Sequence, residues 1–468
     1  MARLIPLDGA RDLIVAPATA PGVGAIAIVR LSGPGAIHLA TRIHSARLKE
    51  HDPGSLRLGS LKDPSTGEVI DRCLAVGWLA PKSYTGEEMV EFHLHGSPAI
   101  VDRTVALCVA TGARQAHPGE FTRRAFIAGK IDLAQAEAVA NLTNARTDAA
   151  RRAALAQMGG GLSDALAAIR RDLVQVTAEL EASVDYPEEH LPATQTERLV
   201  RLVEKARLAL HALASSFERG RLLAHGARVV LAGAPNAGKS SVFNALLRRE
   251  RAIVSPHPGT TRDSLECMLD LQGVPLTLID TAGLREPGEE IEAIGIERTR
   301  ALLPSADLVL FLVNPMESPD EALKEFQAVA AIPHVVVVTR RDLVPDAARQ
   351  ESLASRFHGP GGVGWIAIHS ASPRDIERLE ELLLAHLRAA PTDGGDTNML
   401  TSARHRDALR AAAHSLGAVP AGLAAGLAPE LIVLDLAEAL SRIDSVTGAG
   451  SLDEDILDAI FSTFCLGK

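Results

Sequence analysis

Residues 227–241 read ARVVLAGAPNAGKSS, and this stretch decides the fold of the central part of the chain. Its first half is an apolar strand, and its second half, 233–240, has the Gly-x-x-x-x-Gly-Lys-Ser spacing of a phosphate-binding loop. In such a loop successive backbone N–H groups point at phosphate oxygens, while Lys239 reaches the outer phosphates and Ser240 offers its hydroxyl to Mg²⁺. The segment 241–247 is helical in character, so its positive N-terminal end faces the same anion. The sequence therefore predicts a Mg²⁺-dependent nucleoside triphosphatase.

Two further motifs have the character of GTPase switches. GTTRD occupies 259–263, and an apolar strand at 275–279 runs into DTAG at 280–283. Phosphoryl transfer requires a threonine, here Thr261, to complete the coordination of Mg²⁺, and an aspartate, here Asp280, behind the metal. Gly283 can rotate to sense the γ-phosphate.

Two more strands, 334–338 and 365–369, lead into loops expected to recognise the base, the second of which begins at Ser370 and Ala371. The first loop normally reads Asn-Lys-x-Asp, and its aspartate accepts two hydrogen bonds from guanine that adenine cannot donate. Here the loop reads TRRD, so Asp342 is kept while Thr339 and Arg340 replace the asparagine and the lysine. A mismatched buried polar group discriminates by about 10⁴ or more. We therefore expect guanine selectivity to persist on Asp342, with weaker affinity.

One absence is also informative. Ras-like enzymes place a glutamine directly after Asp-x-x-Gly to hold the attacking water, but this chain has Leu284 there. The polar group must come from elsewhere, and the acidic stretch 285–295 offers several glutamates. A charge run of this kind is also typical of a solvated loop.

These motifs, together with both ends of the chain, resemble the MnmE family, also called TrmE, of tRNA modification GTPases. In the central and C-terminal parts the resemblance rests on GAPNAGKSS at 233–241, GTTRD at 259–263, DTAGLRE at 280–286 and FCLGK at 464–468. In the N-terminal part it rests on IVA at 14–16, GAIAIVRLSG at 24–33, YTGE at 84–87, HG at 95–96 and PGEFTRRAF at 118–126. The phosphate loop alone would not separate this family from ribosome-assembly GTPases, which share GTTRD, but the flanking regions do.

The expected fold is a multidomain α/β chain. The resemblance implies an N-terminal α+β folate-binding, aminomethyltransferase-like domain, a discontinuous helical domain and an inserted Ras-like P-loop G domain with a mainly parallel sheet. The expected boundaries are 1–119 for the N-terminal folate-binding and dimerisation domain, 120–221 for the first helical part, 222–390 for the G domain, and 391–468 for the second helical part with its C-terminal Cys-x-Gly-Lys. An apolar stripe in steps of three or four residues predicts one long amphipathic helix over 155–184.

Composition agrees with a large cytoplasmic protein. The chain has 468 residues, four scattered cysteines without metal-ligand spacing, and a formal charge of −10. These features fit a reducing compartment and argue against nucleic-acid binding driven by the field of the whole molecule. No stretch is long and apolar enough to span a membrane, and the first twenty residues do not resemble a signal peptide. Contact with tRNA must then be local or shared with a partner.

The resemblance also implies particular ligands. GTP or GDP would bind with Mg²⁺ on Ser240 and Thr261. A K⁺ ion would be held when two G domains meet, on Asn236, Ser255, His257 and Thr260. By position Glu292 matches the family's water-orienting glutamate, with Arg262 and Asp263 completing the expected catalytic set. 5-Formyltetrahydrofolate or a related tetrahydrofolate would bind Arg30, Glu91, Lys130 and Lys468. The full expected GTP site comprises Asn236, Ala237, Gly238, Lys239, Ser240, Ser241, Ser255, Pro256, His257, Pro258, Gly259, Thr260, Thr261, Asp280, Thr281, Ala282, Gly283, Thr339, Asp342, Ser370, Ala371 and Ser372.

The implied partners are a second copy of the chain, the FAD-dependent protein MnmG in a heterotetramer, and tRNA, with no membrane. The implied activity is GTP hydrolysis that helps install an aminomethyl-type group at C5 of a wobble uridine. Two alternatives remain: a ribosome-assembly GTPase of the Era/Der type, and a folate-dependent aminomethyltransferase that GTP regulates. The first alternative loses support because no Gly-x-x-Gly RNA-binding module occurs in a helical context.

Overall fold

The structure is a computed structural model, and it describes residues 12–46, 48, 53–185, 192–249, 252–253, 265–280, 303–387, 399–450 and 454–468. The chain divides into two compact units, each assembled from separate stretches. The first comprises Met1–Ala140, Met158–Tyr186 and Ala428–Lys468, and the second comprises Asn141–Gln157 and Pro187–Leu427. Among the described residues, no helix combines the length and the apolar character needed to cross a membrane.

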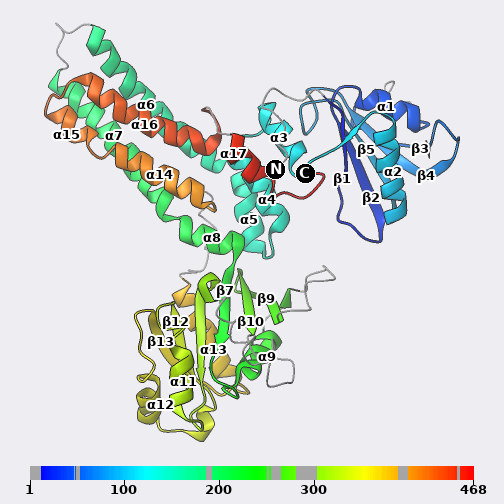
Figure 1. The fold of residues 1–468 in the computed structure, drawn as a ribbon. Helices are drawn as coiled ribbons and strands as arrows, with labels where there is room; N and C mark the ends of the chain where they lie inside the picture. Colours follow the sequence, from blue (N-terminus) through cyan, green and yellow to red (C-terminus); the bar gives the residue numbers. More distant parts are fainter. Residues whose placement is uncertain are drawn as a thin grey trace. The chain divides into compact units, whose positions relative to one another are not determined.

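The first unit contains a six-stranded sheet with strand order β3-β4-β5-β2-β1-β6 (Figure 1). The strands are β1 (Ile14–Pro17), β2 (Gly24–Ser32), β3 (Arg57–Lys62), β4 (Val69–Trp78), β5 (Met89–Gly96) and β6 (Arg114–Gln115). Neighbours are antiparallel except β1 and β6, which are parallel. Helices α1 (Ala36–Ile43) and α2 (Pro98–Ala110) pack on Val29, Leu31 and Phe92. Because side chains alternate along a strand, Arg30 and Glu91, which are paired in register, lie on the other face.

The helices of the first unit come from both sides of the central domain in the sequence. Besides α1 and α2, the described helices are α3 (Glu120–Ile127), α4 (Leu133–Asn144), α6 (Gly161–Asp185), α16 (Pro429–Thr447) and α17 (Glu454–Phe461). Helix α6 packs along α16, and α17 packs on α3. Leu133, Phe461 and Phe464 share one apolar core. The last residues of the chain are thereby held beside its first hundred and forty.

The apolar stripe predicted as a single helix over 155–184 is two helices in the structure. Helix α5 (Asp148–Met158) ends before Gly160, and α6 begins at Gly161. Gly160 has φ of +92°, a left-handed conformation that glycine adopts without steric cost. The prediction of one helix was wrong because spacing alone ignored the two glycines at 159 and 160. The break coincides with the boundary between the two compact units.

The second unit contains a seven-stranded sheet with order β13-β12-β11-β7-β10-β9-β8. The strands are β7 (Ala227–Ala232), β8 (Ala252–Ile253), β9 (Leu265–Leu271), β10 (Val274–Asp280), β11 (Leu308–Val313), β12 (His334–Val338) and β13 (Gly362–Ala367). The five strands from β13 to β10 are parallel, and β9 and β8 are antiparallel additions. Strand β11 and the four valines of β12 form continuous buried apolar runs, as expected for a sheet covered on both faces. The expectation of an inserted, mainly parallel G-domain sheet is confirmed.

Helices cover both faces of this sheet. Helices α9 (Lys239–Arg249) and α13 (Pro373–His386) share one core with β7, and α11 (Pro319–Phe326) and α12 (Ala347–Ala354) share the core of the other face. The described part of this unit also contains α5 and the helices α7 (Ala193–Ser215), α8 (Phe217–His225), α14 (Ala403–Ser415) and α15 (Val419–Ala424). Helix α7 packs on α14 and α15.

A hydrogen bond joins the segment before α5 to the sheet of the same unit. The Thr147 hydroxyl donates to the carbonyl oxygen of Gly273, in the turn between β9 and β10, at 2.8 Å.

Candidate functional site

The phosphate-binding loop lies between the central strand β7 and helix α9. Gly233 has φ of +139°, and a Cβ at this position would collide with the Leu312 carbonyl oxygen on the neighbouring strand. Asn236 also has a positive φ, of 57°. The Lys239 ammonium donates to the carbonyl oxygens of Gly233 and Ala234, the latter at 2.8 Å. The loop therefore has the tight turn and the buried lysine that its sequence predicts.

A carboxylate lies directly beside the hydroxyl expected to bind Mg²⁺. The Ser240 hydroxyl donates to Asp280 Oδ2 at 3.1 Å. Asp280 ends β10, which is parallel to β7, so the carboxyl ends of both strands meet at one edge of the sheet. Its side chain is buried. Mg²⁺ prefers oxygen ligands and usually takes only one or two of them from the protein, so the Ser240 hydroxyl and the Asp280 carboxylate fit a Mg²⁺ site.

Thr339 connects the first base-recognition loop to the phosphate loop. Its hydroxyl lies 2.9 Å from the Ala237 carbonyl oxygen and 3.2 Å from that of Val313. The short side chain that replaces asparagine thus remains a donor to the phosphate loop. Gly238 next to this contact has φ of +96°, a backbone conformation that glycine adopts without steric cost.

Asn314 is a second support of the phosphate loop, and the sequence reasoning missed it. Its Nδ2 donates to the Asn236 carbonyl oxygen at 3.3 Å and to Glu317 Oε1 at 3.2 Å. The available signal was its position: a polar residue directly after the all-apolar strand β11, which neighbours β7.

A cleft of about 830 Å³ lies between α9 and α13, where the base-recognition loops were expected. It is lined by Ser241, Asn244 and Ala245 on one side and by Ser370, Ala371, Pro373, Ile376 and Glu377 on the other. Ser372 caps α13, since its hydroxyl accepts from the Asp375 amide. Asp342 Oδ1 lies 3.8 Å from His369 Nε2, and the Asp342 side chain is half exposed. The loops that carry Asp342 and Ser370 therefore lie side by side, next to the phosphate loop.

Several expected site residues lie outside the described part of the chain. They are Ser255, Pro256, His257, Pro258, Gly259, Thr260, Thr261, Arg262, Asp263, Thr281, Ala282, Gly283, Leu284 and Glu292.

A second cluster of charged side chains lies on the face of the N-terminal sheet opposite α1 and α2. Arg30 Nε donates to Glu91 Oε1 at 2.8 Å, and Arg30 Nη1 donates to the Gly467 carbonyl oxygen at 3.0 Å. The guanidinium also lies 5.9 Å from the ring centre of Tyr84 and 5.6 Å from that of Phe121. The cluster thus combines a carboxylate, a cation and two aromatic rings.

Lys468 belongs to the same cluster. The Phe121 amide donates to its carbonyl oxygen at 3.2 Å. Burial, and then the nearby charge of Arg30, hold the pKa of the Lys468 ammonium below its usual range. Gly467 has φ of +86°, and a Cβ there would collide with the Pro17 carbonyl oxygen. The sequence-predicted residues Arg30, Glu91 and Lys468 are therefore close together.

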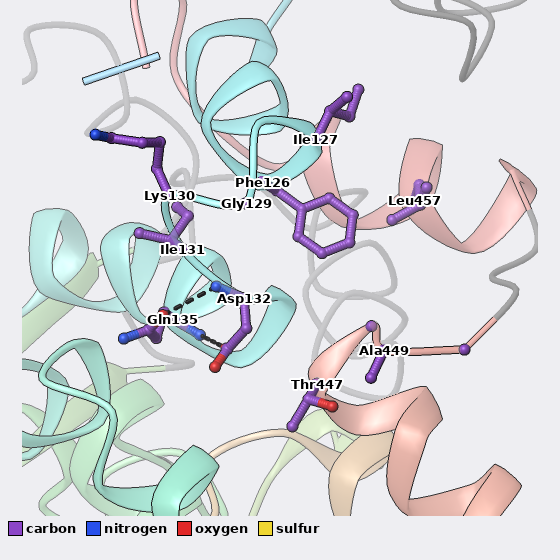
Figure 2. A pocket seen from close by; sticks show the side chains of 12 residues that line it. Phe126, Ile127, Gly129, Lys130, Ile131, Asp132, Gln135, Thr447, Ala449 and Leu457 are labelled. Atoms are coloured by element: carbon purple, nitrogen blue, oxygen red, sulfur yellow. Dashed lines mark hydrogen bonds between the residues drawn. The ribbon is translucent and has the colours of Figure 1, made fainter. Parts of the chain in front are cut away.

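Lys130 makes a different contact. Its ammonium donates to the Pro81 carbonyl oxygen at 2.9 Å. Its side chain also lines a hollow of about 750 Å³ formed with Phe126, Leu457 and Thr447 (Figure 2). In that view Lys130 extends away from Phe126 and Leu457, and Asp132 and Gln135 exchange two hydrogen bonds below it. The structure thus assigns Lys130 to the rim of this hollow.

A phosphate-binding loop at the carboxyl edge of a mainly parallel sheet, with an aspartate behind its serine and two base-recognition loops beside it, defines a P-loop GTPase. Comparison with known proteins identifies the family. The family description "MnmE helical domain" matches residues 133–465, and "GTP-binding protein TrmE N-terminus" matches residues 13–130.

Full-length relatives agree with these matches. The tRNA modification GTPase MnmE of Heliobacterium modesticaldum is 40% identical, over 98% of this chain and 99% of the relative. Those of Chloroflexus aurantiacus and Aquifex aeolicus are 41% and 38% identical, over 98% of this chain and 100% of each relative. The chain belongs to the MnmE family of GTPases, as its motifs predicted.

Proposed function

We propose that this protein hydrolyses GTP in the cytoplasm to drive modification of tRNA at C5 of a wobble uridine, together with the FAD-dependent partner MnmG in a heterotetramer. The supporting observation is that relatives named tRNA modification GTPase match 98% of the chain, which retains the Ser240–Asp280 pair beside its phosphate loop. GTP hydrolysis supplies movement, and the partner's flavin and a folate supply the one-carbon chemistry. The domain boundaries expected from the sequence are part of this proposal.

The Arg30 cluster is the proposed folate site. A carboxylate has about four lone-pair positions, so Glu91 can accept from the aminopyrimidine edge of a pterin while it remains bonded to Arg30. Arg30 and Lys468 provide positive charge for the carboxylates of the folate tail. Tyr84 and Phe121 offer ring faces for a flat ligand. When bound, 5-formyltetrahydrofolate or a related tetrahydrofolate would supply a one-carbon unit; Lys130 would join the site from the rim of its own hollow.

Hydrolysis is proposed to depend on K⁺ and on pairing of two G domains, with Asn236, Ser255, His257 and Thr260 holding the cation and Glu292 orienting water. Of these residues, the structure describes Asn236. Its φ is positive, and its carbonyl oxygen accepts a hydrogen bond from Asn314 Nδ2. A cation that neutralises charge on the transferring phosphate, as an arginine finger does, is worth about 10³–10⁵ in rate. Such a cation would take the place of an arginine finger, and Glu292 would take the place of the glutamine that is absent at Leu284.

The homodimer is proposed to form through the N-terminal domain. Ile26, Leu58 and Leu74 lie on the sheet face opposite α1 and α2, and all three side chains are exposed. Exposed apolar groups on one sheet face favour association with a second apolar surface.

Analysis of tRNA nucleosides tests the proposed reaction. Mass spectrometry of a strain that lacks the protein should show loss of the C5 substituent at the wobble uridine. The wild-type chain should restore the substituent, whereas the Lys239→Ala variant should not. Intact modification in the deletion strain would reject the proposal, and co-sedimentation with ribosomal particles would then favour an assembly GTPase.

Cation dependence is tested separately. GTP turnover in KCl and in NaCl at equal ionic strength should differ by orders of magnitude, and equal rates would reject the K⁺ site. Glu292→Ala should lower turnover while nucleotide affinity stays unchanged. An unaltered rate in this variant would remove Glu292 from its proposed role.

A further inference from the structure

One buried carboxylate, that of Asp375, contacts both base-recognition loops. Asp375, in the first turn of α13, accepts through Oδ2 from the backbone N–H of His369 at 2.9 Å. The same oxygen lies 3.2 Å from Arg341 Nε. His369 directly precedes Ser370 of the second loop, and Arg341 directly precedes Asp342 of the first. The Asp375 side chain, which is 2% exposed, thus contacts the residue that precedes Ser370 and the residue that precedes Asp342.

Asp375 stands on a rigid support. Its own amide donates to the Ser372 hydroxyl that caps α13, at 3.4 Å. The next turns of the helix place Ile376 and Leu379 in the core of the sheet. A carboxylate in the first turn of a helix also interacts favourably with the positive end of the helix dipole. The position of Asp375 is therefore fixed by helix α13 and its packing on the core of the sheet.

Two further contacts limit how far the loops can separate. The Arg341 amide donates to the Ile368 carbonyl oxygen at 3.0 Å, and the Ile368 amide donates to the Val338 carbonyl oxygen at 2.9 Å. Both hold the backbone where the strands end. Beyond that point the contacts to Asp375 hold the Arg341 side chain and the His369 amide. A change at Asp375 would therefore affect the loop tips more than the strand ends.

We propose that Asp375 is a positioning residue for guanine recognition. By holding the Arg341 guanidinium on one side and the His369 amide on the other, it keeps the Asp342 carboxylate and the Ser370–Ala371 segment at the separation that the guanine edge requires. This inference rests on the proposed recognition of guanine by Asp342. A buried charge is costly unless hydrogen bonds compensate it. Moving either loop away from Asp375 would remove one of these bonds, so the charge restrains both loops, whereas a neutral residue at 375 would not impose this restraint.

The test compares two nucleotides on the full chain. IDP lacks the exocyclic amino group of GDP, so the ratio of their dissociation constants measures the bond from that amino group to Asp342. In the wild type GDP should bind more tightly than IDP. Asp375→Ala should reduce this preference by about tenfold, which corresponds to about 1.4 kcal/mol. Arg341→Ala and Asp375→Asn should give smaller reductions, since each keeps the contact to one of the two loops.

The matched control is Asp346→Ala. Asp346 caps α12 through the Ala348 amide at 3.0 Å, so its loss removes a capping carboxylate of the same domain without changing either loop. A merely structural role of Asp375 would lower the melting temperature, and would weaken GDP and IDP equally, as we expect for the control. If Asp375→Ala fails to fold, Asp375→Asn and Arg341→Ala decide the question.

An unchanged GDP to IDP ratio in the folded variants would overturn the role of Asp375. A wild type that does not prefer GDP over ADP would instead overturn guanine recognition itself, so the two failures are distinguishable.

Discussion

The phosphate loop and the Arg30 cluster differ in how they are assembled. The loop is formed by eight consecutive residues, 233–240, between a strand and a helix of one sheet. The cluster joins Arg30 of β2, Glu91 of β5 and the last two residues of the chain. A site made from consecutive residues needs only its own turn geometry and neighbouring strands. A site made from distant residues needs the tertiary fold to bring its parts together, so changes far from its charges can disrupt it.

The largest expected effect is in the local site. Lys239→Ala removes the buried ammonium that is expected to bind the outer phosphates, and loss of one such preorganised donor lowers the rate by about 10²–10³. Phosphate release from GTP should fall by this factor, whereas Lys324→Ala on the exposed side of α11 should behave as the wild type. Equal turnover in both variants would contradict the assignment of the loop.

The next effect concerns the assembled site. Gly467→Ala forces a Cβ against the Pro17 carbonyl at a positive φ, so the C-terminal residues must move and Arg30 loses its contact with the Gly467 carbonyl. Affinity for 5-formyltetrahydrofolate should fall at least tenfold, or about 1.4 kcal/mol, in calorimetry. GTP hydrolysis should be unaffected.

Leu466→Ala is the control for that variant, since its side chain is exposed and its backbone is unconstrained by a collision. Full folate affinity in Gly467→Ala would show that the C-terminal residues are not part of the site.

Acid should weaken the first unit through Glu120. Burial by itself raises the pKa of Glu120, but hydrogen bonds from Arg114, the His117 amide and Arg124 outweigh it and lower the pKa below 4.5. This stabilisation is therefore present above pH 4.5 and is lost as the pH falls through the lowered value. Glu120→Gln should cost about 1.5–3 kcal/mol at pH 7 and should flatten the acid dependence.

Urea unfolding at several pH values from 7 to below 4.5 measures this effect. Glu68→Gln, an exposed partner of Arg103, should retain the wild-type curve. A wild-type free energy of unfolding that does not decline in acid would exclude Glu120 as its source.

The smallest effect is expected at Thr339. Thr339→Val keeps the shape of the side chain but removes the hydroxyl that lies 2.9 Å from the Ala237 carbonyl oxygen. One neutral hydrogen bond is worth about 0.5–1.5 kcal/mol, so GDP affinity should fall by about threefold to tenfold. Thr339→Ser, which keeps the hydroxyl, should bind GDP as the wild type does. A loss of affinity in both variants would assign the effect to packing instead.

Much of the central domain could be predicted because its signals are local. The strand at 334–338 and the phosphate loop lie where the sequence placed them, since an unbroken apolar run and a fixed glycine spacing are both local signals. The helix over 155–184 was mispredicted because apolar periodicity continues across Gly160, where the backbone does not. Asn314 and Asp375 were missed for a different reason: each acts on residues at least six positions away, through contacts that only the folded sheet creates.

The sequence by itself determined the chemical character of this protein: a phosphate loop, a serine and an aspartate that fit a Mg²⁺ site, and the membership of a GTPase family. These depend on residue types at fixed short spacings, and local backbone geometry converts such spacings directly into position. Only the tertiary structure decided that Arg30, Glu91 and Lys468 lie together while Lys130 lines another hollow, and that Asp375 contacts both recognition loops. Those contacts arise from strand pairing and helix packing between distant segments, and no short stretch of sequence encodes the distance between them.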